Sequence, residues 1–160
     1  MSFNFDELLQ QGKGAAENVL QNRKEIREVL TDLENSLSQF LSLEIEFEER
    51  NEYIHDNSDP FTRAASLFKP REKTGFKVVY IKSKSVSVEK ALFKLKRSDD
   101  VYPITIAKDR NHLISDEQSE FANAVGQIVS NSQFHLQLNS FKRQVEEKLA
   151  EQTPLVPKSE

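Results

Sequence analysis

The fold of this chain depends on residues 26–48, which read IREVLTDLENSLSQFLSLEIEFE. Up to Phe40 the apolar residues recur in steps of three and four, as they do on one face of a helix. From Leu41 to Phe47 every second residue is apolar, and serine or glutamate lies between. Alternation of this kind is typical of a strand with one buried face. The stretch therefore predicts a helix that passes directly into a strand.

The helical pattern also extends towards the N-terminus, through Leu8, Gly12, Ala15 and Val19. Residues 1–40 are therefore predicted to form one long helix. Its well-patterned part alone, some 25 residues, would be about 38 Å long and would overhang a small sheet. We expect the apolar stripe either to pack on its own sheet or to form a self-association interface. The residues predicted for that interface are Ile26, Leu30, Leu33, Leu37 and Phe40.

The region after the first strand predicts an antiparallel meander of about four strands within residues 41–114. Residues 91–96 fit a helix as well as a strand, and we favour a strand because Ser98-Asp99-Asp100 is a good turn before a β-rich segment. A short helix is expected before Pro70. The further strands are predicted at 76–82, 91–96 and 102–106, with a possible short one at 112–114.

The C-terminal part returns to helical spacing and predicts a helical pair over residues 115–151. Pro154 and Pro157 follow the last helical pattern, so residues 152–160 are predicted to be a disordered tail. The predicted fold class is therefore α+β: a single domain over residues 1–151 with a long N-terminal helix, an antiparallel sheet and two C-terminal helices.

The composition excludes several classes of protein. The chain has 160 residues, of which 37% are hydrophobic and 30% charged, and it contains no cysteine. There is then no disulfide framework, thiolate zinc site or cysteine nucleophile, and nothing argues for an oxidising compartment. We see no secretory signal and no apolar run of the ~20 residues that a membrane span requires. A cytoplasmic location without membrane contact is predicted.

Charge is strongly segregated along the chain. Residues 69–97 hold ten Lys/Arg and two acids, about +8, whereas residues 1–59 hold fourteen acids and five Lys/Arg, about −9. A local excess of this kind either recognises an anion or pairs with the acidic part of the same molecule. If the basic segment binds an anion, the candidate residues are Lys77, Lys82, Lys84, Lys94 and Lys96.

Internal pairing, nucleic acid and an acidic protein partner all remain open for this segment. In the first case the outward row Glu44, Glu46 and Glu48 lies beside an outward lysine row, with Lys77, Lys94 and Lys96 as its expected members. In the second, aromatic side chains among the lysines stack on bases. The segment KTGFKVVY at 73–80 partly matches an RNA-recognition strand, but Val78 stands where that motif has its second aromatic residue.

No catalytic, metal or cofactor pattern is found. The acids of residues 44–59 lack the glycine and terminal glutamate of a calcium loop. His55, His112 and His135 have no second ligand at metal-binding spacing, and no strained Gly-x-Ser-x-Gly turn is present. The sequence therefore predicts a protein that is not an enzyme and that has no metal or cofactor.

These observations favour a non-enzymatic protein-interaction module, such as an adaptor, inhibitor or immunity-type factor, that self-associates and binds another protein. The alternative is a nucleic-acid-binding protein that uses the basic strand surface of residues 69–97.

Overall fold

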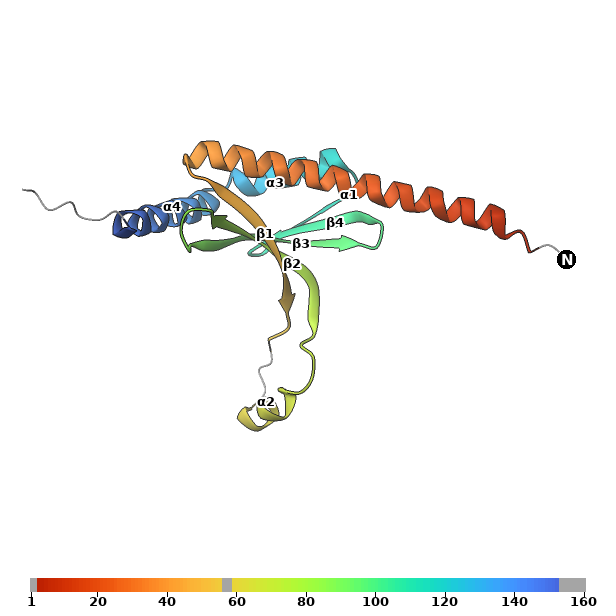
Figure 1. Ribbon diagram of the computed structural model, residues 1–160, viewed down its shortest axis with the longest axis horizontal. Coiled ribbons are helices and arrows are strands. Elements are labelled where there is room, and N and C mark those ends of the chain that lie inside the picture. Colours follow the sequence, from red (N-terminus) through yellow and green to blue (C-terminus); the bar gives the residue numbers. More distant parts are fainter. Residues whose placement is uncertain (1–2, 56–58, 153–160) are drawn as a thin grey trace, which may run out of the picture.

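A computed structural model describes residues 3–55 and 59–152 of the chain (Figure 1). It shows the α+β arrangement expected from the sequence, with a long N-terminal helix, an antiparallel sheet and two C-terminal helices. In chain order the elements are α1 (Phe5–Leu41), β1 (Ile45–Tyr53), α2 (Pro60–Ser66), β2 (Lys73–Ser83), β3 (Glu89–Ser98), β4 (Val101–Lys108), β5 (Asn111–Ser115), α3 (Gln118–Val129) and α4 (Ser132–Gln152).

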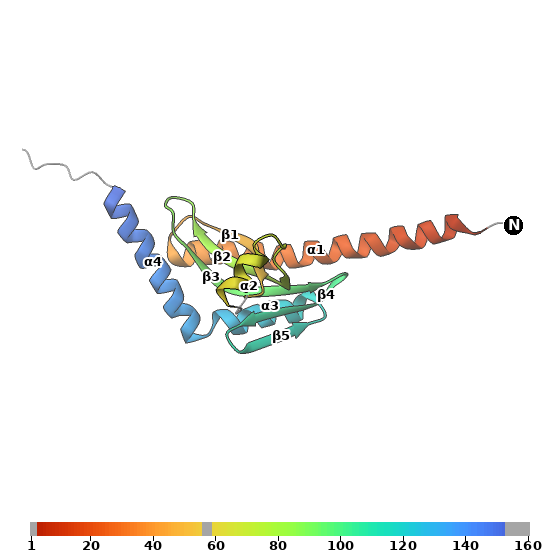
Figure 2. The same ribbon diagram turned by 90° about the horizontal axis from the view of Figure 1, so that it is seen from below.

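The sheet is a five-stranded antiparallel meander in the order β1-β2-β3-β4-β5. The segment 91–96 is a strand, as favoured, and the possible strand at 112–114 is β5. Helices α1 and α3 lie side by side over one face of the sheet, whereas α4 turns away and crosses its end near β3 (Figures 1 and 2). The β1–β2 hairpin extends from the sheet as an arm that carries α2 at its tip.

The first strand begins later than the alternating pattern predicted. Leu41 is the last residue of α1, and Ser42 then adopts a left-handed conformation with φ 54°. The backbone N–H groups of Ser42 and Leu43 donate to the carbonyl oxygens of Gln39 and Ser38, at 3.3 and 3.2 Å. Residues 41–44 therefore form the end and cap of α1. The strand can start only after this turn, in which backbone N–H groups bind the last carbonyl groups of the helix.

The helix-covered face of the sheet holds the core. Ile26 and Leu37 from α1 pack with buried residues of the sheet, α3 and α4, among them Phe121, Phe134 and Phe141. Polar bonds also fix α1: Asn22 donates to the carbonyl of Asp100 at 3.0 Å, and Glu34 accepts from the N–H of Phe47 at 2.9 Å.

Tyr102 makes a further contact with α1, because its hydroxyl lies 3.3 Å from a carboxylate oxygen of Glu25. Burial and the adjacent carboxylate of Glu25 raise the pKa of Tyr102 to about 12. The phenol therefore keeps its proton, and can donate to Glu25, up to a higher pH than an ordinary tyrosine.

The end of the chain differs slightly from the prediction. Gln152, expected in the tail, is the last residue of α4. The remainder of the predicted disordered tail, 153–160, lies outside the described residues.

Candidate functional site

The residues predicted for self-association lie where α1 covers the sheet. Ile26 and Leu37 are buried, at 1% and 5% exposed, and Leu30 and Leu33 are partly buried against the same core. Phe40 alone is open to solvent, at 62%, and its ring meets that of His135 edge-on at 5.7 Å. Most of this set is therefore used for packing within the chain.

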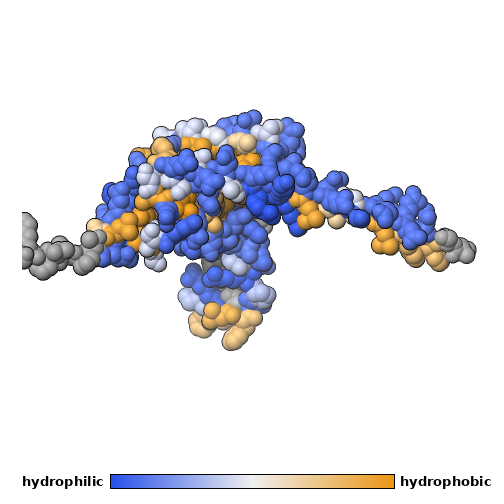
Figure 3. All heavy atoms as spheres, turned by 45° about the horizontal axis from the view of Figure 1, so that its top comes forward, coloured by the Kyte–Doolittle hydropathy of each residue, from blue (hydrophilic) through white to orange (hydrophobic). Residues whose placement is uncertain are grey.

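The N-terminal part of the same helix has no such cover. Residues 5–18 project beyond the sheet and the other helices (Figures 1 and 2), and we call them the projecting segment. Leu8 and Leu9 in it are 55% and 70% exposed. Figure 3 shows apolar atoms along this end of the molecule.

The apolar side of the projecting segment is the continuation of the buried side of α1. Positions 8, 12, 15 and 19 lead by steps of three and four to Asn22 and then to Ile26, so they share one face of the helix. Val19, partly buried, marks the point where the core begins. The helix thus has one apolar face of which only the C-terminal part is covered.

The segregated charges meet across β1, β2 and β3. On the face turned away from α1, Glu48 binds Arg50 at 2.6 Å and Lys82 at 3.2 Å, and Arg50 also binds Glu89. Hydrogen bonds from Arg50 are the main cause of the lowered pKa values of Glu48 and Glu89. The Arg50 guanidinium also lies 4.3 Å from the ring centre of Tyr80.

The five lysines proposed for anion binding do not form one surface. Lys82 is bound by Glu48 and Lys94 by Glu52, each at 3.2 Å. Lys96 lies over the ring of Phe76, 5.7 Å from its centre, and Lys84 is exposed at the end of β2. Lys77 is on the opposite face, towards α1.

The internal pairing predicted for the outward acids therefore occurs only in part: of Glu44, Glu46 and Glu48, Glu48 alone has an ion pair among the described residues. Lys94, a member of the expected lysine row, does pair with an acid of β1, but that acid is Glu52. On β2 the lysine that pairs with β1 is Lys82, where Lys77 was expected. Glu49 pairs with Arg97 on the α1 side at 2.7 Å. Lys77 cannot take the place of Lys82 because it lies on the same side of β2 as buried Val79 and Ile81, whereas Lys82 lies on the outward side with Tyr80.

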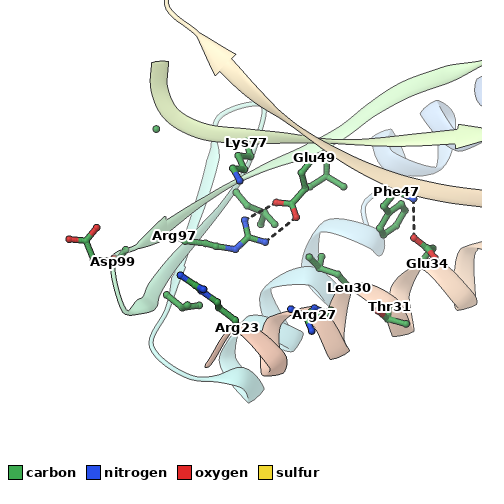
Figure 4. A pocket seen from close by; sticks show the side chains of 15 residues that line it. Arg23, Arg27, Leu30, Thr31, Glu34, Phe47, Glu49, Lys77, Arg97 and Asp99 are labelled. Atoms are coloured by element: carbon green, nitrogen blue, oxygen red, sulfur yellow. Dashed lines mark hydrogen bonds and ion pairs between the residues drawn. The ribbon is translucent and has the colours of Figure 1, made fainter. Parts of the chain in front are cut away.

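A cleft of about 610 Å³ opens between α1 and the adjacent strands. Arg23 and Arg27 reach into it from α1 and Lys77 from β2 (Figure 4). None of these three cations makes a hydrogen bond or ion pair to any other part of the chain that the structure describes. The lining also contains five apolar residues, which we call the floor: Leu30, Phe47, Val79, Leu95 and Val101.

The acids around this cleft are already bound or turned outwards. The Glu49 carboxylate accepts hydrogen bonds from both terminal guanidinium nitrogens of Arg97, at 2.7 and 3.2 Å. Glu34 accepts the Phe47 N–H, and Asp99 points away from the cleft (Figure 4). The cleft therefore presents three unpaired cations beside an apolar floor.

Sequence reasoning identified Lys77 but missed Arg23 and Arg27. The available signal was their spacing of four, which places both on one side of a helix, in step with Leu30. Which strand residues lie opposite Arg23 and Arg27 depends on how α1 lies over β2 and β3. No local sequence pattern encodes that arrangement.

The tip of the arm is a third exposed surface. Phe61, Leu67 and Phe68 are 88%, 80% and 94% exposed, and Figure 3 shows this apolar tip clearly separated from the body. The tip begins at Asp59, whose carboxylate accepts the N–H of Thr62 at 2.8 Å and so caps α2.

Over residues 3–55 and 59–152 no group of three or more His, Asp or Glu side chains is placed to hold a metal ion. Two of the histidines have ring contacts, His112 with Phe76 and His135 with Phe40. His55, from the acidic segment, is exposed just after β1.

No helix in the described ranges is both long and apolar enough to span a membrane. Comparison with protein-family models, with curated proteins and with solved structures finds no match.

Proposed function

We propose that this chain is a protein-interaction module without a catalytic role, and that it self-associates through the projecting segment of α1. The observation that carries the proposal is the apolar face of α1, whose N-terminal part is exposed while its continuation is buried. Exposed apolar surface of this continuity is typical of interaction sites. The proposal retains the cytoplasmic location expected from the absence of cysteine.

Helix stability gives a physical reason for a partner. The projecting segment of 14 residues is about 21 Å long. The segment continues a helix that the packed part of α1 already nucleates, but it has no tertiary contacts of its own with the rest of the described chain, and such contacts supply most helical stability in proteins. Gly12 and Gly14 weaken the segment further, by about 1 kcal/mol each relative to alanine. Burial of its apolar face by a partner would offset that cost.

A second copy of the chain fits this face. Small residues occupy the middle of the segment, at Gly12, Ala15 and Ala16, and larger ones lie on either side. In an antiparallel pair that crosses at the small residues, Leu8 and Leu9 of one copy would lie beside Val19 and Leu20 of the other. Such a contact is self-complementary, as a two-fold symmetric interface requires, and it also aligns the helix dipoles favourably.

The variant Leu8→Glu/Leu9→Glu tests this proposal. We expect the wild type to have a mass above 18.4 kDa in size-exclusion chromatography with light scattering, and the variant to be a folded monomer with unchanged core stability. Buried charge at a helix contact is costly because it loses its hydration. The matched control is Gln10→Glu/Gln21→Glu, which adds the same charge on the opposite face of α1.

A wild type that is monomeric up to several hundred micromolar would contradict self-association. A Leu8→Glu/Leu9→Glu variant that stays associated would contradict the projecting segment as its interface. Circular dichroism and urea unfolding of the variant check that its fold is intact.

Nucleic-acid binding by the strand surface of residues 69–97 stays an untested prediction. The pairing of Lys82 and Lys94 with glutamates leaves it without a specific observation in its favour.

A further inference from the structure

We infer that the cleft between α1 and strands β1, β2 and β3 binds an acidic peptide segment of a partner protein. The inference deepens the proposed interaction function by naming the chemistry of a partner, but the site is separate from the projecting segment. It rests on the convergence of Arg23, Arg27 and Lys77, from two elements far apart in the sequence, on one cleft.

The unpaired cations are the first step of the argument. Lys82, Lys94 and Arg97 on the sheet are paired with carboxylates, whereas Lys84 and Lys96 have no ion pair among the described residues but do not converge on one cleft. Here three cations line one cleft without an ion pair to any carboxylate of the described residues, although like charges repel each other. An anion that entered the cleft would relieve this repulsion and could accept hydrogen bonds from both guanidinium groups.

The orientation of the arginines is the second step. Arg23 and Arg27 are one helical turn apart, so their side chains reach into the cleft from the same side of α1. Arg97 is held in place by two bonds to Glu49 and borders the site without being available to a ligand. The site thus has one fixed cation, Arg97, and three cations without a bound partner among the described residues, Arg23, Arg27 and Lys77, that can turn towards a ligand.

The floor and walls indicate a peptide. Leu30, Val79 and Leu95 provide an aliphatic surface suited to an apolar side chain, and the cleft volume of about 610 Å³ lies within the usual range for ligand sites. Glu34 and Glu49 in the walls limit how much negative charge can enter, which disfavours a continuous phosphate backbone more than a few carboxylates. A segment with a few carboxylates next to an apolar residue satisfies the cations and the floor together.

The test uses a fluorescein-labelled peptide, (Glu-Glu-Leu)4, and its uncharged counterpart (Gln-Gln-Leu)4, titrated with the full chain at about 50 and 200 mM salt. We expect the acidic peptide alone to bind, and to bind more weakly at higher salt because exposed charges are screened. Arg23→Glu/Arg27→Glu should weaken binding at least about tenfold, as loss of close charge pairs does. The control Arg143→Glu/Lys148→Glu makes the same charge change on α4 and should bind as the wild type does.

A second measurement locates the site. In ¹H–¹⁵N correlation spectra the acidic peptide should shift the signals of Arg23, Arg27, Lys77 and their neighbours. No binding at 50 mM salt, equal binding by the two charge-reversal variants, or shifts confined to another surface would each overturn the inference. Tighter binding of a labelled twelve-residue oligothymidine would overturn its peptide part. All these results are independent of the mass of the protein, so failure here is distinguishable from failure of self-association.

Discussion

Arg50 lies at the centre of the ionic surface that joins β1, β2 and β3. It binds carboxylates of two strands, Glu48 on β1 and Glu89 on β3, and its guanidinium lies over Tyr80 of β2. These bonds favour the ionised carboxylates, so they lower the pKa of both glutamates below the ordinary value of 4.5. Arg50 thereby links β1 and β3 across β2, while Lys82, Lys94 and Arg97 offset part of the acidic excess of residues 1–59.

The lowered pKa values predict how stability depends on pH. A carboxyl group with a lower pKa in the folded state stabilises that state fully above its unfolded pKa, here about 4.5, and the contribution is lost as pH falls through the folded value. We expect the urea midpoint of the wild type to fall below about pH 4.5, and Arg50→Met to reduce the steepness of that fall.

The control for this measurement is Lys84→Met, which removes an equally charged group from the end of β2. Its pH dependence should match that of the wild type, because its side chain makes no ion pair with the described residues. Identical pH profiles for Arg50→Met and wild type would contradict the assigned role of Arg50.

At the scale of elements, Lys108 links β4 to β3 and α4. The register shift between β2 and β3 places Val79 opposite Phe93 and Tyr80 opposite Ala91, so that Leu92 is the extra residue of a bulge. Lys108 Nζ donates to the carbonyl of Leu92 at 2.8 Å and to the side-chain oxygen of Gln137 at 2.6 Å. Burial lowers the pKa of this amine. One buried side chain thus provides the hydrogen-bond donor for the carbonyl group of the bulged residue and also positions α4.

We predict that Lys108→Met destabilises the protein by about 1–3 kcal/mol, because it leaves the buried Leu92 carbonyl without its donor. Urea unfolding measures the loss, and hydrogen exchange should show faster opening of α4. Lys142→Met, a change on α4 at a 4.0 Å surface ion pair, should stay within about 0.5 kcal/mol. A Lys108→Met variant as stable as that control would show that the link is dispensable.

The elements also show how far the sequence could predict the structure. Periodicity located α1, and the turn at Ser98–Asp100 correctly decided between helix and strand for residues 91–96. The start of β1 was predicted four residues early, because Leu41 and Leu43 fit a strand pattern as well as a helix cap. The bulge at Leu92 follows from pairing between strands, and no local pattern indicates it.

The candidate sites, too, were only partly predictable from the sequence. The continuous apolar face of α1 and the charge segregation were readable from residue order alone. Which part of that face is covered depends on where the sheet ends, and the expected interface at Ile26 and Leu37 is packed inside the chain. The cleft at Arg23 and Lys77 exists only after α1 lies over β2.

At the scale of the whole molecule, the described chain consists of a body with two projections. The body has one core shared by the sheet and helices α1, α3 and α4. The projecting segment and the arm tip extend from it in different directions, and both expose large apolar side chains (Figures 1 and 3). Surface of this kind away from the core contributes little to the stability of the isolated chain, which is consistent with the proposed interaction function.

The measurement that tests self-association most directly is an intermolecular distance by double electron–electron resonance. The chain has no cysteine, so Gln10→Cys introduces a single spin label on the polar side of the projecting segment and leaves the apolar face intact. An antiparallel pair that crosses near Gly14 separates the two labels by about 12 Å along the helices and 8–10 Å between their axes, before the label arms are added. We predict one intermolecular distance of roughly 20–30 Å for Gln10→Cys and none as short for Asn139→Cys on α4. An absence of any intermolecular distance at Gln10→Cys, at several hundred micromolar protein, would contradict the account.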